Sequence, residues 1–171
     1  MSSTESEHSA YKTLRINAIV DESIVDGPGF RMTVFTQGCP HHCVGCHNPQ
    51  THDFAGGYDV KIEDILERFD DNPLLCGMTL SGGEPFCQSE ALVPLAEAVK
   101  SRGKTVMAYS GYTYEQLLQL DDPFVRKLLC LCDILVDGPF ILAQRNLELL
   151  FRGSENQRML FLRDGKITHT C

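Results

Sequence analysis

GCPHHCVGCHN, residues 38–48, carries three cysteines in the spacing Cys-x3-Cys-x2-Cys. The side chains of Cys39, Cys43 and Cys46 offer three soft thiolates on one short loop, which suits an iron–sulfur cluster. A cubic four-iron cluster held there would be one protein ligand short. Because an iron with a free coordination position can bind a substrate directly, as an open catalytic zinc site does, the stretch predicts a cluster that does chemistry.

Two other groups fit the same loop. The segment Cys43–His47 matches the attachment pattern of c-type haem, but that chemistry is usually extracytoplasmic, and the chain opens without a charged-then-apolar export signal. Zinc is the stronger rival, because a nearby histidine could complete a tetrahedral site beside the cysteines. The histidines in question are His41, His42, His47 and His52. The loop alone leaves zinc and iron–sulfur both open.

A second motif follows a short apolar strand predicted at Met78–Leu80. The next residues, Ser81-Gly82-Gly83-Glu84-Pro85, form a tight turn whose glycines let the backbone approach a ligand without a Cβ in the way. Together with the cysteine loop, this turn resembles the radical S-adenosylmethionine (radical SAM) enzymes. In that family the methionyl amino and carboxylate groups of SAM fill the open iron position, and a Gly-Gly-Glu segment takes the SAM amino group. The joint match favours a 4Fe-4S cluster over zinc.

Three further segments indicate which group of radical SAM enzymes the chain resembles. Asp26–Gly29 is by composition a turn, but with Arg31 and the cysteine loop after it the segment resembles the signature of activating enzymes of glycyl radical proteins, including pyruvate formate-lyase activating enzyme. Asp133–Phe140 and Arg152–Arg158 resemble the activating proteins of anaerobic (class III) ribonucleotide reductase. The match spans roughly Arg15 to Ile167.

This resemblance implies a set of site residues. The metal ligands would be Cys39, Cys43 and Cys46, and no side chain is implied as catalytic, because the chemistry belongs to the cluster and SAM. The implied SAM contacts are Gly45, Cys46 and His47 on the adenine side, Gly82 and Gly83 on the methionine side, Glu84 at the amino group, and Asp137. Many radical SAM enzymes carry an aromatic residue where this chain has Gly45, so an adenine contact there would come from backbone. Since the turn and the cysteine loop are separate in sequence, Gly83→Val is expected to weaken SAM binding while the cluster still assembles.

The implied activity is that of a radical SAM oxidoreductase. After one electron arrives from an external donor such as a flavodoxin, SAM is cleaved reductively, and the resulting radical takes hydrogen from a glycine. That glycine would lie on the large catalytic subunit of anaerobic ribonucleoside-triphosphate reductase. Two alternatives stay open: activation of another glycyl radical enzyme such as pyruvate formate-lyase, or a non-catalytic zinc or iron–sulfur binding module.

Composition predicts one soluble domain. The 171 residues, 43% of them hydrophobic, suit a single domain over residues 11–171 behind a loose, Ser- and Glu-rich tail at residues 1–10. No apolar run approaches the ~20 residues of a membrane span. A net charge of −8, from 15 Lys+Arg against 23 Asp+Glu, leaves no electrostatic footprint for nucleic acid.

Cysteine usage indicates the cytoplasm. Eight cysteines without an export signal suit a reducing compartment, where thiols serve metals or packing more often than disulfides. Outside the loop, Cys76, Cys87, Cys130 and Cys132 are expected to pack as small hydrophobes, and Cys171 to be an exposed thiol.

Predicted strands alternate with helices along the chain. The strands are Leu14–Val20, Met32–Thr36, Met78–Leu80, Thr105–Tyr109, Ile134–Val136 and Met159–Leu162. Apolar stripes predict helices at Ile62–Phe69 and around Leu92–Val99, and a capping box from Thr113 to Gln116 predicts another at Glu115–Leu120. This alternation favours an α/β fold with a parallel sheet, which we interpret as an incomplete TIM-like β/α barrel of the radical SAM type. Ligands would then bind at the carboxyl ends of the strands.

Overall fold

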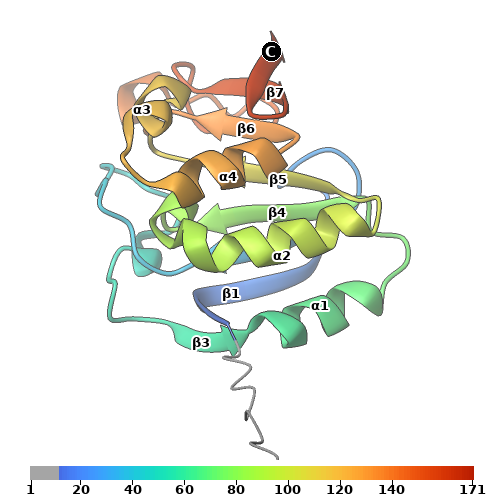
Figure 1. Cartoon of the computed structure of the whole chain (residues 1–171). Coiled ribbons are helices and arrows are strands. Elements are labelled where there is room, and N and C mark those ends of the chain that lie inside the picture. The colour runs from blue at the N-terminus through green and yellow to red at the C-terminus, as the bar shows by residue number, and fades with distance from the viewer. Residues whose placement is uncertain (1–11) are drawn as a thin grey trace, which may run out of the picture.

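The computed structural model describes residues 12–171, so the tail predicted at residues 1–10 lies outside the described residues. These residues form a mixed α/β fold around one sheet, whose strand order is β3-β1-β2-β4-β5-β6-β7-β8 (Figure 1). The strands are β1 (Thr13–Ser23), β2 (Arg31–Thr36), β3 (Tyr58–Lys61), β4 (Gly77–Gly82), β5 (Thr105–Tyr109), β6 (Ile134–Asp137), β7 (Arg158–Arg163) and β8 (Lys166–Thr170). The helices are α1 (Ile62–Asp70), α2 (Ser89–Ser101), α3 (Tyr114–Gln119) and α4 (Pro123–Leu131), with 3-10 turns η1 (Pro49–Thr51), η2 (Pro85–Gln88) and η3 (Leu142–Gln144).

The four central strands are parallel. Val34 of β2 lies opposite Leu80 of β4, which lies opposite Ala108 of β5, and β6 continues the parallel order. The outer strands are antiparallel: β2 returns beside β1 after a loop at residues 24–30, and β7 returns beside β6 without a crossover helix. The parallel arrangement predicted from the sequence is therefore confirmed for the centre and wrong for the outer pairs, because a strand joined by a non-helical connection can pair antiparallel with its predecessor.

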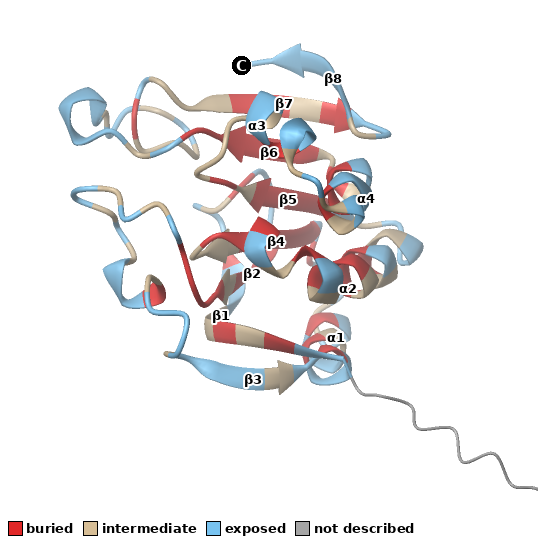
Figure 2. Cartoon of the chain, turned by 60° about the vertical axis from the view of Figure 1, so that its left-hand side comes forward, coloured by how far each residue is buried: buried red, intermediate tan, exposed pale blue. Residues whose placement is uncertain are grey.

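One face of the sheet is covered by helices. Helices α1, α2 and α4 lie in front of the strands in Figure 1, and the buried residues gather between the two layers in Figure 2. On β4, Met78 and Leu80 join the main core cluster while Thr79 faces the other way, as the two-residue period of a strand requires. The stripes predicted in α1 and α2 are confirmed as core. Thr113 and Gln116 form the predicted capping box, with the helix beginning at Tyr114.

The opposite face carries a buried arginine. Arg31 is 1% exposed, and its guanidinium donates to Thr79 Oγ1 at 2.8 Å, Met78 O at 3.0 Å and Thr105 Oγ1 at 2.9 Å. Burial lowers its pKa from the ordinary value. Thr79 in turn donates to Asp26 O at 2.8 Å. Arg31 therefore ties β2 to β4 and β5, and the Asp26–Gly29 turn is fastened to the same network.

The cysteines outside the loop do not share one environment. Cys132 is 2% exposed and packs in the core, as expected. Cys76, Cys87 and Cys130 are exposed, so the packing role expected for them is wrong. Cys130 shows the reason, because it lies on the outward face of α4 while its neighbour Leu129 points into the core. Cys171 is exposed, as expected.

Within residues 12–171, no helix has the length and apolar character needed to cross a bilayer.

Candidate cofactor site

A cavity opens where the central strands end. Because β2, β4, β5 and β6 are parallel, their carboxyl ends meet at one edge of the sheet. The cavity there has a volume of about 560 Å³. It is enclosed by the cysteine loop (residues 38–48), the Gly-Gly turn (residues 81–85), the residues after β5 and β6, and a closing segment (residues 139–157) that leads to β7. Lining residues from these segments include Cys39, Cys43, Cys46, His47, Gly82, Gly83, Ser110, Gly111, Gly138, Phe140 and Gly153.

The cysteine loop folds back on the chain that follows it. Gly38 N donates to Thr51 O at 2.7 Å, and Cys39 N donates to His52 O at 3.2 Å. Gly38 and Gly45 have φ values of +98° and +75°, which glycine adopts without a steric penalty. Cys39 is 8% exposed, and all three loop cysteines are free thiols.

The surroundings of the first loop thiol shift its pKa. Burial is the largest cause that raises the pKa of Cys39; the Glu84 carboxylate and the other loop cysteines act in the same direction, against a backbone hydrogen bond at His41. Within residues 12–171, no group of three or more His, Cys, Asp or Glu side chains is placed to hold one metal ion.

Unpaired polar atoms also point to a ligand in the cavity. His52 Nε2 and Arg152 Nε are buried without a hydrogen-bond partner, and both residues line the cavity. A buried polar atom left unpaired costs about 1–3 kcal/mol. A polar cofactor bound here would supply acceptors for such atoms. The residues present therefore fit an iron–sulfur cluster with a polar co-ligand.

The Gly-Gly turn packs directly on the cysteine loop. Gly83 N donates to Thr36 O at 2.8 Å, and Glu84 N donates to Gly38 O at 2.8 Å. A Cβ added to Gly83 would lie 2.3 Å from Gly38 O, and one added to Gly82 would lie 2.5 Å from Thr36 N. The premise that the Gly-Gly turn is independent of the cysteine loop is therefore wrong, because the two segments share a backbone contact. That Gly83→Val weakens SAM binding stays a prediction.

Glu84 does not face the cavity. Its side chain is 0% exposed, and its carboxylate accepts hydrogen bonds from Phe86 N, Ser110 Oγ, Gly111 N and His41 Nε2 at 3.1, 2.9, 2.8 and 2.7 Å. The SAM contact implied for Glu84 stays a prediction. In this structure its carboxylate joins the Gly-Gly turn, the cysteine loop and the end of β5.

Asp137 is also turned away from the cavity. It is 1% exposed, and its carboxylate accepts from Arg158 Nε at 3.0 Å and from Tyr114 N at 2.7 Å, at the start of α3. Hydrogen bonds to Asp137 and then to Glu115 raise the pKa of Arg158. The next residue, Gly138, does line the cavity. The structure thus brings the loop cysteines and glycines together and leaves Asp137 in an ion pair outside.

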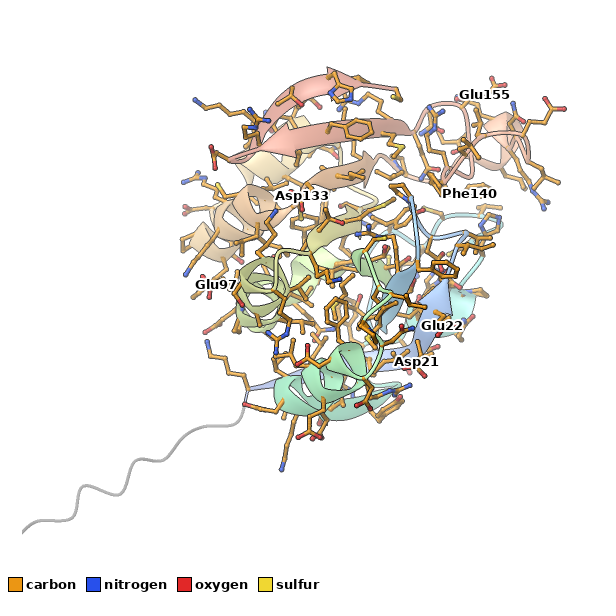
Figure 3. The ribbon with its side chains drawn as sticks, turned by 90° about the vertical axis from the view of Figure 1, so that its right-hand side faces the viewer. Asp21, Glu22, Glu97, Asp133, Phe140 and Glu155 are labelled. Carbon is orange, nitrogen blue, oxygen red and sulfur yellow. The ribbon has the colours of Figure 1, made fainter. Side chains whose placement is uncertain are left out.

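The closing segment contributes cavity-lining residues that were not predicted from the sequence. Phe140 approaches His47 with ring centroids 5.0 Å apart, where the segment comes down toward the cysteine loop (Figure 3). A Cβ on Gly153 would lie 3.0 Å from Phe140, and one on Gly45 would lie 3.0 Å from Leu142. An aromatic side chain at position 45 would therefore collide with the closing segment. The Arg152–Arg158 motif marked this region in the sequence but did not show that it reaches the cysteines.

Comparison with a protein-family model locates the same region. The model described as a 4Fe-4S single cluster domain matches residues 25–160, which include the cysteine loop, the Gly-Gly turn and the closing segment.

Several similar proteins carry one name. Anaerobic ribonucleoside-triphosphate reductase-activating proteins are 39% identical over 142 residues in Vibrio cholerae and 35% identical over 144 residues in Haemophilus influenzae, in both cases covering 78% of this chain and 89% of the relative. The protein of that name from Escherichia coli strain K12 is 32% identical over 148 residues, or 82% of this chain and 94% of the relative.

Two other matches are partial. The pyruvate formate-lyase-activating enzyme of Clostridium pasteurianum is 38% identical over 119 residues, which are 63% of this chain and 49% of that enzyme. The crystal structure of QueE from Escherichia coli aligns with a TM-score of 0.48 at 18% identity, over 64% of this chain and 58% of that one.

Proposed function

The chain belongs to the family of anaerobic ribonucleoside-triphosphate reductase-activating proteins, and from this premise we propose that it generates the glycyl radical on such a reductase as a radical SAM enzyme. One observation carries the proposal. Three free cysteines and a Gly-Gly turn, which are separate in sequence, line one cavity at the carboxyl ends of parallel strands.

The chain's own residues bind and orient the cofactors. Cys39, Cys43 and Cys46 would hold a 4Fe-4S cluster, and a cavity of about 560 Å³ lies within the ordinary size of small-molecule sites. Gly82 and Gly83 would contact the methionine side of SAM, and Gly45, Cys46 and His47 the adenine side. When bound, the two cofactors would supply the one-electron chemistry that takes a hydrogen atom from a glycine of the partner.

The closing segment shields this chemistry from water. Phe140 and Leu142 lie against His47 and Gly45 of the cysteine loop. Excluding water prevents side reactions of a reactive intermediate and strengthens the electrostatic interactions within the site.

The same family assignment implies the fold type, the compartment, the electron donor and the partner. In this proposal the sheet corresponds to the incomplete β/α barrel of radical SAM enzymes, and the described residues 12–171 belong to one domain. Eight free cysteines suit the cytoplasm, where an external donor such as a flavodoxin supplies the electron. The partner is the large catalytic subunit of the reductase, and a net charge of −8 disfavours nucleic acid and anionic membrane surfaces.

A second function is favoured by one observation. The match to the pyruvate formate-lyase-activating enzyme reaches 38% identity, although it covers only 49% of that enzyme. The deciding experiment mixes reconstituted protein, SAM and a one-electron reductant with either the reductase subunit or pyruvate formate-lyase. We expect a glycyl radical signal in electron paramagnetic resonance (EPR) spectra of the reductase mixture. A signal with pyruvate formate-lyase alone would reassign the partner.

A further inference from the structure

The ring of His41 is in contact with protein groups on several sides. Its Nε2 lies 2.7 Å from the buried carboxylate of Glu84, and its ring stands edge-on against Tyr112, with centroids 4.5 Å apart. Gly111 closes a third side, since a Cβ there would lie 2.3 Å from His41 Cδ2. The adjacent His42 is exposed, and its ring stands edge-on to that of His52 with centroids 5.2 Å apart. Two neighbouring histidines of one loop therefore sit in opposite environments.

Glu84 is committed to protein partners. Both of its oxygens accept hydrogen bonds, from η2, from the residues after β5, and from His41. A carboxylate that is 0% exposed needs such donors, because a buried polar group without hydrogen bonds is costly. The same donors hold its oxygens in one orientation, so the position of His41 is set by the β-sheet rather than by the loop.

The cysteine loop is attached to the end of β4 at its first residue, where Glu84 N donates to Gly38 O at 2.8 Å. Within residues 39–47, the side-chain hydrogen bond to the end of another strand is that of His41, while Val44, Gly45 and His47 are exposed. The backbone bond from Cys39 N to His52 O joins the loop to the chain that follows it and not to a strand of the sheet. Without the His41 contact, the segment between the first and second cysteine would be held mainly by its backbone.

We propose that His41, fixed by Glu84, is a positioning residue that docks the cysteine loop on the ends of β4 and β5 before any cofactor binds. The inference rests on the proposed function only in that the loop is taken to hold the cluster. Glu84 then acts through His41 and is not itself a ligand of SAM. The pair preorganises the thiols, which lowers the ordering cost of assembling the cluster.

Four variants isolate the hydrogen bond. His41→Leu removes the donor, and His41→Asn keeps polarity but is too short to reach Glu84. His41→Gln places an amide N–H near the position of Nε2 and should rescue the contact. His42→Leu is the matched control, because it makes the same change at the next residue, which Glu84 does not touch.

The first measurement needs no cluster. Amide hydrogen exchange of metal-free protein is followed at Cys39 and Gly111. Losing a hydrogen bond to a charged group should speed exchange about tenfold or more in His41→Leu and His41→Asn, while His41→Gln and His42→Leu stay within about twofold of wild type. If His41→Leu does not fold, as judged by circular dichroism, His41→Asn decides the outcome.

The second measurement follows the reconstituted protein. Iron loss to a chelator should be faster in the first two variants, and the change that SAM causes in the EPR spectrum of the reduced cluster should be diminished in them and restored in His41→Gln. Wild-type exchange and iron retention in His41→Asn would overturn the inference, as would equal effects at His42. A wild-type protein that holds neither cluster nor SAM would instead defeat the proposed function, while the exchange measurement would still test the positioning role.

Discussion

Gly83→Ala provides a direct test of how the Gly-Gly turn and the cysteine loop are joined. The new Cβ would lie 2.3 Å from Gly38 O and 2.9 Å from Gly38 C, and both are backbone atoms that cannot rotate away. Overpacking of this kind costs about 1–3 kcal/mol. Displacement of Gly38 also weakens the 2.8 Å bond from Glu84 N to Gly38 O, at about 0.5–1.5 kcal/mol. The two effects together destabilise the fold by about 2–4 kcal/mol.

The assay compares stability and cofactor loading in one preparation. For a chain of this size the loss corresponds to a fall in Tm of about 5–15 °C. We expect iron content and SAM affinity to fall together in Gly83→Ala. Gly103→Ala is the control: its φ of +70° costs about 1–2 kcal/mol, but no atom lies within 4 Å of the added Cβ, so iron content should stay at the wild-type level. Gly83→Ala protein with wild-type Tm and full iron, but weak SAM binding, would refute the shared contact.

Three further outcomes follow from the structure. Cys39→Ser should prevent cluster assembly, as measured by iron and sulfide content, whereas Cys130→Ser should leave it intact; equal loss in both would mean that the ligands are misassigned. Burial raises the pKa of Cys132 to about 12, so little thiolate forms at neutral pH, and alkylation followed by mass spectrometry should label Cys130 and spare Cys132, with equal labelling contradicting the burial. Arg31→Met should lower the free energy of unfolding in urea by about 2–4 kcal/mol, because the acceptors around Arg31 lose a charged donor, and a change below about 1 kcal/mol would show that the network is dispensable.

The central strands and helices could be predicted because their burial leaves a pattern in the sequence. Met78–Leu80 and Thr105–Tyr109 are apolar runs within β4 and β5, and α1 and α2 carry apolar stripes. Strands β3 and β8 left no such pattern, since β8 is exposed along its whole length and β3 nearly so. Their pairing depends on backbone hydrogen bonds at the two edges of the sheet, to which side-chain chemistry contributes little.

In the site, too, some features could be predicted from the sequence and others could not. Spacing alone grouped Cys39, Cys43 and Cys46, because ligands that share a loop are also neighbours in sequence. The direction of the Glu84 carboxylate could not be predicted, since it is set by donors on η2, after β5 and on the cysteine loop. The ion pair of Asp137 could not be predicted for the same reason, because its partner Arg158 lies on β7, which pairs antiparallel with β6. The contact of Asp137 with SAM stays a prediction.

The most direct test of the proposed function measures SAM cleavage and radical transfer together. Anaerobically reconstituted protein is given SAM and a one-electron reductant, with and without the large reductase subunit. We expect about four irons per chain, formation of methionine and 5′-deoxyadenosine, and a glycyl radical signal only when the reductase subunit is present. Protein that binds zinc in place of iron, or that binds iron and SAM but forms no 5′-deoxyadenosine, would contradict the assignment.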